Sequence, residues 1–110
     1  MTVSQQKVHE LKINRHYFSN ILTGKMNFEL RVNDCDFVAG DILHLREWDK
    51  AELEYTGNEI IVPTTYILYS HDHYGIRSDY CILGLDTKMM EITDNVADAT
   101  QKEGEEVGIS

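Results

Sequence analysis

The part of this 110-residue sequence whose residue types are best suited to chemistry is a short run in which polar and apolar residues alternate. Glu29, Arg31 and Asn33 occupy every second position there, and an apolar residue precedes each of them. This period of two predicts a half-buried strand over 28–32 with a solvated polar face. That face would present a carboxylate acceptor, a guanidinium fork and an amide. Such a set could bind a ligand, or it could be a solvated strand face with a Glu29–Arg31 ion pair.

The elements that must position this strand can be predicted from spacing and capping residues. Asn14 is a suitable N-cap, and Gly24 a suitable left-handed stop, for a helix over 15–23. Pro63 predicts that the strand containing it lies at a sheet edge or carries a bulge. Five short strands and one early helix predict an α+β fold that is predominantly β, in the form of a small mixed barrel. The predicted strands span 8–13, 28–32, 41–48, 60–69 and 80–85, and the predicted loops span 49–59 and 70–79.

Short motifs along the chain resemble a known family. In their order they resemble the DUF3850 proteins, small bacterial and phage proteins within the ASCH superfamily, over residues 8–86. ASCH domains are PUA-like β-barrels suspected of binding RNA, so the resemblance implies that fold and a cleft between the helix and the barrel. The matching segments are His9-Glu10-Leu11-Lys12-Ile13, Tyr17-Phe18, the stretch from Gly24 to Arg31, Asn33-Asp34, Phe37-Val38-Ala39-Gly40-Asp41, Glu47-Trp48, Tyr55-Thr56-Gly57 and Tyr80-Cys81-Ile82-Leu83-Gly84.

The signature of ASCH domains, Gly-x-Lys-x-x-Glu-x-Arg, is only partly present. Gly24, Glu29 and Arg31 fall on the pattern, but its lysine position is Met26. Some ASCH relatives are amidohydrolases that remove an acetyl group from acetylated cytidine nucleosides with this lysine and a threonine, and the threonine position here is Asn27. A nucleophilic mechanism needs a nucleophile beside its base. We therefore expect no enzyme activity, no catalytic residue and no cofactor.

The cleft that the resemblance implies would suit single-stranded RNA or a nucleotide. Arginine can fork onto phosphate or guanine, asparagine can pair with a base edge, and tryptophan can stack. Trp48 could equally cap the barrel. As an alternative, this acidic chain could bind a host protein, possibly as a mimic of nucleic acid, and a structural or assembly role is a third class. The candidate RNA- or nucleotide-binding residues are Lys12, Lys25, Glu29, Arg31, Asn33, Arg46, Trp48 and Tyr55.

Charge is unevenly distributed along the chain. The net charge is −9, yet residues 1–33 contain five basic residues against two acidic ones. Residues 89–110 contain six acidic residues against one lysine. This distribution argues against a broad basic surface for nucleic acid but leaves room for a local anion site. We expect an ASCH/PUA-like domain over 1–88 and a flexible, disordered acidic tail over 89–110.

The remaining features predict a cytoplasmic protein without a metal site and without a membrane partner. No apolar run approaches the length of a membrane span, and the N-terminus lacks the apolar stretch of a signal peptide. Cys35, in a predicted turn, and Cys81, in a predicted strand, form no disulfide framework. His71 and His73 could share one side of an extended chain, but no third ligand is near in sequence, so solvated loop histidines are predicted.

Overall fold

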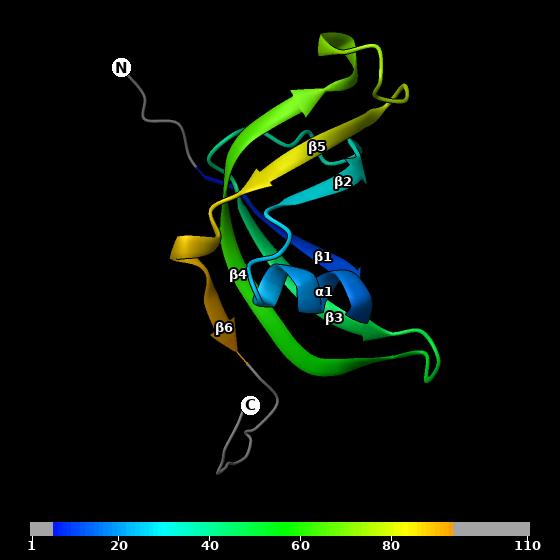
Figure 1. Ribbon diagram of the computed structural model, residues 1–110, viewed down its shortest axis with the longest axis vertical. Helices are drawn as coiled ribbons and strands as arrows, with labels where there is room; N and C mark the ends of the chain where they lie inside the picture. Colours follow the sequence, from blue (N-terminus) through cyan, green and yellow to red (C-terminus); the bar gives the residue numbers. More distant parts are fainter. Residues whose placement is uncertain (1–5, 94–110) are drawn as a thin grey trace.

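The computed structural model describes residues 6–93, which form a six-stranded sheet and one α-helix (Figure 1). The predicted class, α+β and predominantly β, is confirmed. No helix within these residues combines the length and the apolar character needed to cross a bilayer. In chain order, the elements are β1 (Val8–Asn14), α1 (Arg15–Leu22), β2 (Phe28–Val32), β3 (Ile42–Asp49), β4 (Glu54–Tyr69), β5 (Tyr80–Leu85) and β6 (Glu91–Thr93), with 3-10 turns at Ser70–Asp72 and Thr87–Met89.

Strand β4 is the longest strand, and it connects the two halves of the sheet (Figure 1). Its first part pairs with β3 and β6, and its last part pairs with β5. The change of partner comes at an irregularity between Thr64 and Ile67, directly after Pro63. Proline has no N–H to give to a ladder, so it is tolerated next to such a bulge. This agrees with the bulge predicted for the proline-containing strand.

The sheet is open, and the predicted closure into a barrel is not seen. The strand order is β1-β3-β4-β5-β2, and no ladder joins the two end strands. β1 runs parallel to β3, whereas the other paired strands are antiparallel. The end strands are linked instead by a side chain, because the guanidinium of Arg31 on β2 donates to the carbonyl oxygen of Lys12 on β1.

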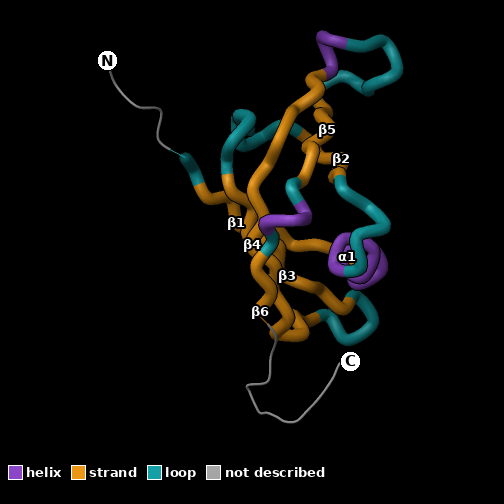
Figure 2. The backbone as a smooth tube through the Cα atoms, turned by 60° about the vertical axis from the view of Figure 1, so that its left-hand side comes forward, coloured by secondary structure: helices purple, strands orange, loops and turns teal. Residues whose placement is uncertain are grey.

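The core lies between the curved sheet and α1, which sits to one side of the strands (Figure 2). Every second side chain of β1, β3 and β5 points into it, and α1 adds Phe18 and Ile21. Asn14 accepts a hydrogen bond from the N–H of His16, and Gly24 has a φ of 80°, so the predicted cap and stop are confirmed. The buried core residues are Leu11, Ile13, Phe18, Ile21, Phe37, Leu43, Leu45, Ile60, Val62, Ile67, Cys81, Leu83 and Leu85.

A buried polar pair ties the beginning of β1 to the residue before β3. His9 Nε2 lies 2.8 Å from Asp41 Oδ2, and the two side chains are 9% and 5% exposed. The carboxylate of Asp41 also accepts hydrogen bonds from the N–H groups of Lys7 and Val38. Burial works to raise the pKa of Asp41, but the bonds from His9 and these amides outweigh it, so the pKa lies below its ordinary value of 3.8.

Two segments differ from the sequence predictions. The polar composition of 49–59 predicts a loop, but β4 already begins at Glu54 and pairs with the end of β3. β6 lies in the stretch assigned to the acidic tail, and its pairing with β4 extends the sheet past residue 88. Residues 94–110 of the predicted tail lie outside the described residues.

Candidate functional site

The polar residues of β2 face the interior, which reverses the predicted orientation of this strand. Antiparallel pairing with β5 places Glu29 opposite Leu83 and Arg31 opposite Cys81, and both partners are fully buried. Because the side-chain period of a strand is two, this register fixes which face is inside. Glu29 is 7% exposed, whereas the apolar side chains of β2 are 41–54% exposed. The predicted solvated polar face was therefore wrong.

A pocket opens beside Glu29 where the chain passes from α1 into β2. Its volume is about 280 Å³, and the residues that line it are Tyr17, Met26, Phe28, Glu29 and Leu30. The N–H of Met26 bonds to a carbonyl oxygen of α1, which fixes the pocket wall against the helix. Pockets for drug-sized ligands measure about 300–1,000 Å³, so this one suits a small ligand or one part of a larger ligand. We call it the α1–β2 pocket.

The carboxylate of Glu29 is the polar centre of the α1–β2 pocket. Its Oε2 accepts a hydrogen bond of 2.9 Å from Nε of Arg31. None of the described residues donates a hydrogen bond to Oε1. Burial raises the pKa of Glu29 above its ordinary value of 4.5, and the charge and hydrogen bond of Arg31 offset this in part. A carboxylate in this state can accept an N–H donor from a ligand, and it takes up a proton at a higher pH than an ordinary glutamate does.

Glu29→Gln should raise the thermal midpoint at neutral pH. Because the folded pKa lies above the ordinary 4.5, the carboxyl group favours folding below that value, and this contribution is lost as the pH rises through the folded pKa. Thermal melts should therefore show a larger gain for the variant at about pH 7 than at about pH 4. Glu10→Gln, at a side chain 57% exposed, removes the same charge and is the control. A parent more stable than Glu29→Gln at neutral pH would show that the pair with Arg31 outweighs burial.

A second group of the predicted residues lies on the side of the sheet opposite to α1. Lys12 pairs with Arg46 in the β1–β3 register, and Trp48 pairs with Tyr55 in the β3–β4 register. The Nζ of Lys12 lies 4.0 Å from the centroid of the Trp48 ring, and the Cζ of Arg46 lies 3.9 Å from that of Tyr55. The two rings meet edge to face at 5.0 Å. We call these four residues the outer row.

One of the two positive charges of the outer row, that of Arg46, is paired with neighbouring acids. Arg46 contacts Glu10 at 3.0 Å and Glu59 at 3.3 Å. Nε2 of His44 lies 2.6 Å from the other oxygen of Glu59, and this hydrogen bond is the main reason that the pKa of Glu59 is lowered. The two cations of the outer row are therefore balanced in number by two acids, Glu10 and Glu59. The outer row offers half-buried aromatic surface rather than an excess of positive charge. Trp48 is part of this surface rather than of the core.

The last two predicted residues belong to neither group. Lys25 is exposed in the turn after α1 and does not line the pocket. Asn33 accepts a hydrogen bond of 3.1 Å from the N–H of Phe37, which closes the turn before that core residue. The eight predicted residues therefore do not form one cleft, because Glu29 and Arg31 face inward while the outer row faces away from α1.

The pocket also uses residues whose apolar character predicts burial. Tyr17, Phe28 and Leu30 are 48%, 47% and 54% exposed. Helical spacing assigns Tyr17 to a core stripe, and alternation assigns the other two to the buried face of a strand. A signal that pointed to this wall is Met26, which occupies the lysine position of the signature.

His71 and His73 contact groups within their own loop. The ring of His71 stacks on Tyr69 at 5.4 Å, and its Nδ1 lies 3.1 Å from Asp72. Nδ1 of His73 accepts a hydrogen bond of 2.9 Å from the N–H of Gly75. In the described part of the chain, no three His, Cys, Asp or Glu side chains are grouped so that they could hold a metal ion.

Comparison with known proteins gives a relative and a family. The relative is the "Uncharacterized 12.9 kDa protein in GpA 3'region" of Escherichia phage P2, which is 37% identical over 54 residues. That match covers 49% of this chain and 48% of the phage protein, so it spans about half of each. The model of the family "Domain of unknown function (DUF3850)" matches residues 8–85, from the first residue of β1 to the last residue of β5. With more than half of its length matched in this way, the chain belongs to the DUF3850 family.

Proposed function

We propose that the α1–β2 pocket binds the base of a nucleotide, either free or within single-stranded RNA, and that the protein is a binding module rather than an enzyme. The observation that carries the proposal is the state of Glu29. The residue is 7% exposed and lines an open pocket, with one carboxylate oxygen held by Arg31. The other oxygen receives no hydrogen bond from a described residue. A buried acceptor of this kind favours a ligand that brings an N–H donor.

A nucleobase supplies both kinds of contact that the pocket offers. The amino groups and ring N–H groups of bases are donors that a carboxylate can accept. The rings of Tyr17 and Phe28 are about half exposed, and stacking on an aromatic ring is worth about 1–3 kcal/mol per base. Arg31 is fixed by Glu29 and by the carbonyl of Lys12, with its side chain 25% exposed. Its remaining N–H groups suit a phosphate oxygen.

A longer RNA has a route from the pocket to the outer row. Lys12 connects the two, because its carbonyl oxygen bonds to Arg31 while its ammonium lies over Trp48. A strand bound at Glu29 would cross the edge of β1 at this residue and reach Trp48 and Tyr55. We therefore assign the pocket to one base and the outer row to the nucleotides that follow it.

The other functions considered from the sequence gain less support. Met26 lines the pocket at the position where the amidohydrolases have a lysine, so the site favours binding over deacetylation. Binding of a host protein by nucleic-acid mimicry would depend on the acidic stretch 89–110, and most of that stretch lies outside the described residues.

The proposal predicts that Glu29→Gln weakens nucleotide binding about tenfold or more, because a hydrogen bond to a charged group is worth roughly 1.5–3 kcal/mol. Calorimetric titration with the four ribonucleoside monophosphates and with short single-stranded RNA measures this directly. Arg31→Lys keeps the charge but loses the planar fork, so it should weaken the binding of nucleotides more than the binding of the corresponding nucleosides. Glu91→Gln, at an exposed side chain on β6, is the matched control and should bind as the parent does.

Fluorescence of Trp48, the single tryptophan, separates the pocket from the outer row. Mononucleotides should leave it unchanged, whereas RNA long enough to cross β1 should quench it. Absence of saturable binding by every mononucleotide and RNA would reject the proposed function. RNA binding that quenches Trp48 but is indifferent to Glu29→Gln would move the site to the outer row and reject the pocket.

A further inference from the structure

The side chains that line the α1–β2 pocket offer hydrogen-bond acceptors and almost no donors. An ionised carboxylate such as that of Glu29 only accepts hydrogen bonds, and the hydroxyl of Tyr17 can donate or accept. The other three lining residues, Met26, Phe28 and Leu30, carry no N–H or O–H group in their side chains. The pocket therefore suits a ligand whose facing edge consists of donors.

The carboxylate of Glu29 can accept two donors side by side. A carboxylate has about four lone-pair sites, and Nε of Arg31 uses one of them on Oε2. Within residues 6–93, no group donates a hydrogen bond to Oε1. The side chain of Glu29 is 9% exposed, so little water reaches the remaining sites, and a donor from a ligand is favourable there. Two adjacent N–H groups would satisfy this carboxylate better than one.

Guanine is the common RNA base whose edge carries two adjacent donors, because its ring N1–H lies beside its 2-amino group. Adenine and cytosine place an amino group beside a ring nitrogen that accepts, and uracil places its N–H between two carbonyl oxygens. Against a carboxylate, each of these three edges brings an acceptor close to a negative oxygen. We propose that the α1–β2 pocket selects guanine, whose N1–H and 2-amino group donate to Glu29. This inference rests on the proposed function of nucleotide binding.

The size of the α1–β2 pocket agrees with a purine. A cavity of about 150 Å³ can hold a single benzene ring, and this pocket measures about 280 Å³. It therefore has room for the two fused rings of guanine, while the sugar and the phosphate lie outside. The rings of Tyr17 and Phe28 are about half exposed and provide aromatic surface for stacking on the purine.

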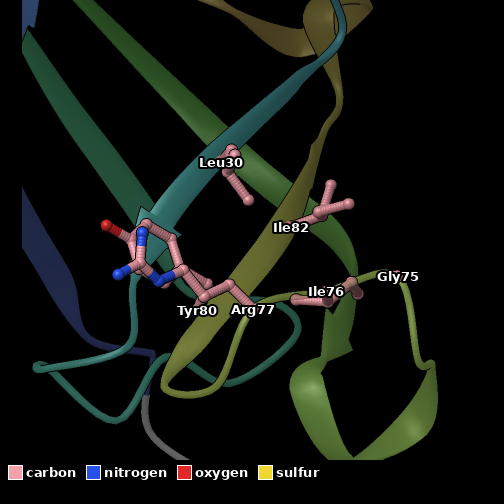
Figure 3. A pocket seen from close by; sticks show the side chains of 6 residues that line it. All are labelled: Leu30, Gly75, Ile76, Arg77, Tyr80 and Ile82. Carbon is pink, nitrogen blue, oxygen red and sulfur yellow. The ribbon is translucent and has the colours of Figure 1, made fainter.

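A second hollow, which shares Leu30 with the α1–β2 pocket, has the opposite chemistry. Its volume is about 420 Å³, and its charged side chain is that of Arg77, whose Cζ lies 5.9 Å from the centroid of the Tyr80 ring. A guanidinium has five donors and no acceptor, so it cannot bind the donor edge of guanine. That edge is therefore expected at Glu29 and not in the second hollow. The hollow is lined by Leu30, Gly75, Ile76, Arg77, Tyr80 and Ile82 (Figure 3).

Calorimetric titration of the full chain with the monophosphates of guanosine, inosine, adenosine, cytidine and uridine tests this selection. The base of inosine keeps the N1–H of guanine and lacks its 2-amino group. Guanosine monophosphate should bind about tenfold more tightly than inosine monophosphate, because one hydrogen bond to a charged group is lost, and more tightly still than the other three. Short single-stranded RNAs that differ in one central base should follow the same order.

Glu29→Gln should remove the preference for guanine, because an amide presents a donor beside an acceptor and so matches adenine or cytosine better. The ratio of the affinities for guanosine and adenosine monophosphates should fall about tenfold or more. Loss of folding would weaken the binding of every nucleotide alike and would leave this ratio unchanged. Two controls should keep the preference, namely Glu91→Gln at an exposed side chain on β6 and Arg77→Gln in the second hollow.

Several results would overturn the selection of guanine by Glu29 while the proposed function stands. These are equal affinity for guanosine and inosine monophosphates, equal affinity for the four bases, and a preference for another base. The selection is equally overturned if Glu29→Gln keeps the preference for guanine, or if Arg77→Gln removes it. Absence of saturable binding by every mononucleotide and RNA would instead reject the proposed function, and this inference with it.

Discussion

Asp41→Ala should lower the free energy of unfolding by about 3 kcal/mol at neutral pH, because removing one member of a buried polar pair commonly costs about 3–5 kcal/mol. The side chain of Asp41 is 5% exposed and receives hydrogen bonds from His9 and from the N–H groups of Lys7 and Val38. Alanine would leave these donors without an acceptor at the point where β1 meets β3. Urea unfolding at neutral pH measures the loss.

The effect of Asp41→Ala should depend on pH in a defined direction. The pKa of Asp41 is lowered from 3.8, so its contribution is present above that value and is lost as the pH falls through the folded pKa. Parent and variant should therefore converge in acid. Asp34→Ala removes an exposed carboxylate that accepts a hydrogen bond from its neighbour Cys35, and should stay within about 0.5 kcal/mol of the parent. Equal losses for both variants would mean that the His9 pair contributes nothing specific.

Arg31→Ala should lower the free energy of unfolding by about 2–3 kcal/mol at neutral pH, less than for a fully buried pair because the side chain of Arg31 is 25% exposed. The variant leaves the buried carboxylate of Glu29 without its partner. It also removes the bond to the Lys12 carbonyl that links the two end strands of the open sheet. Arg15→Ala, at a side chain 61% exposed that contacts Asp49, is the control and should cost about 1 kcal/mol or less.

A double-mutant cycle separates the two contributions of Arg31. In a Glu29→Gln background no buried charge is left without a partner. Arg31→Ala should therefore lower the free energy of unfolding by at least about 1 kcal/mol less than in the parent. The cost that remains reports the bond across β1 and β2. An identical cost in both backgrounds would show that Glu29 and Arg31 act independently, and would weaken the case for a carboxylate held in place for a ligand.

Local sequence signals were sufficient for most of the secondary structure. Asn14 and Gly24 delimit α1 because capping depends on neighbouring backbone groups alone. Alternation placed β1, β2 and β3 for a similar reason, since a period of two is a property of a few adjacent residues. The motifs along residues 8–85 also identified the family. β6 was not predicted because three residues are too few to show a period. β4 was predicted to begin too late because its first residues are polar.

The orientation of β2 was decided only by the tertiary structure. Its alternation is the same whichever side is buried, and the apolar side is the ordinary choice. Pairing with β5 puts Glu29 and Arg31 against the buried Leu83 and Cys81 instead, and leaves Phe28 exposed. A shift of the register by one residue exchanges the buried and the exposed face of a strand. No property of β2 by itself could therefore select between the two faces.

For the candidate site, too, the sequence determined one part and the tertiary structure decided the other. The sequence supplied the chemical types, namely the carboxylate, the guanidinium and the aromatic rings, because these are properties of single residues. Their grouping depends on contacts between positions far apart in the chain, such as Arg31 with Lys12 and Lys12 with Trp48. Those contacts are set by strand order and by the open edge between β1 and β2. This long-range geometry placed six of the eight predicted residues on two sides of the sheet, and the other two in turns, instead of all eight in one cleft.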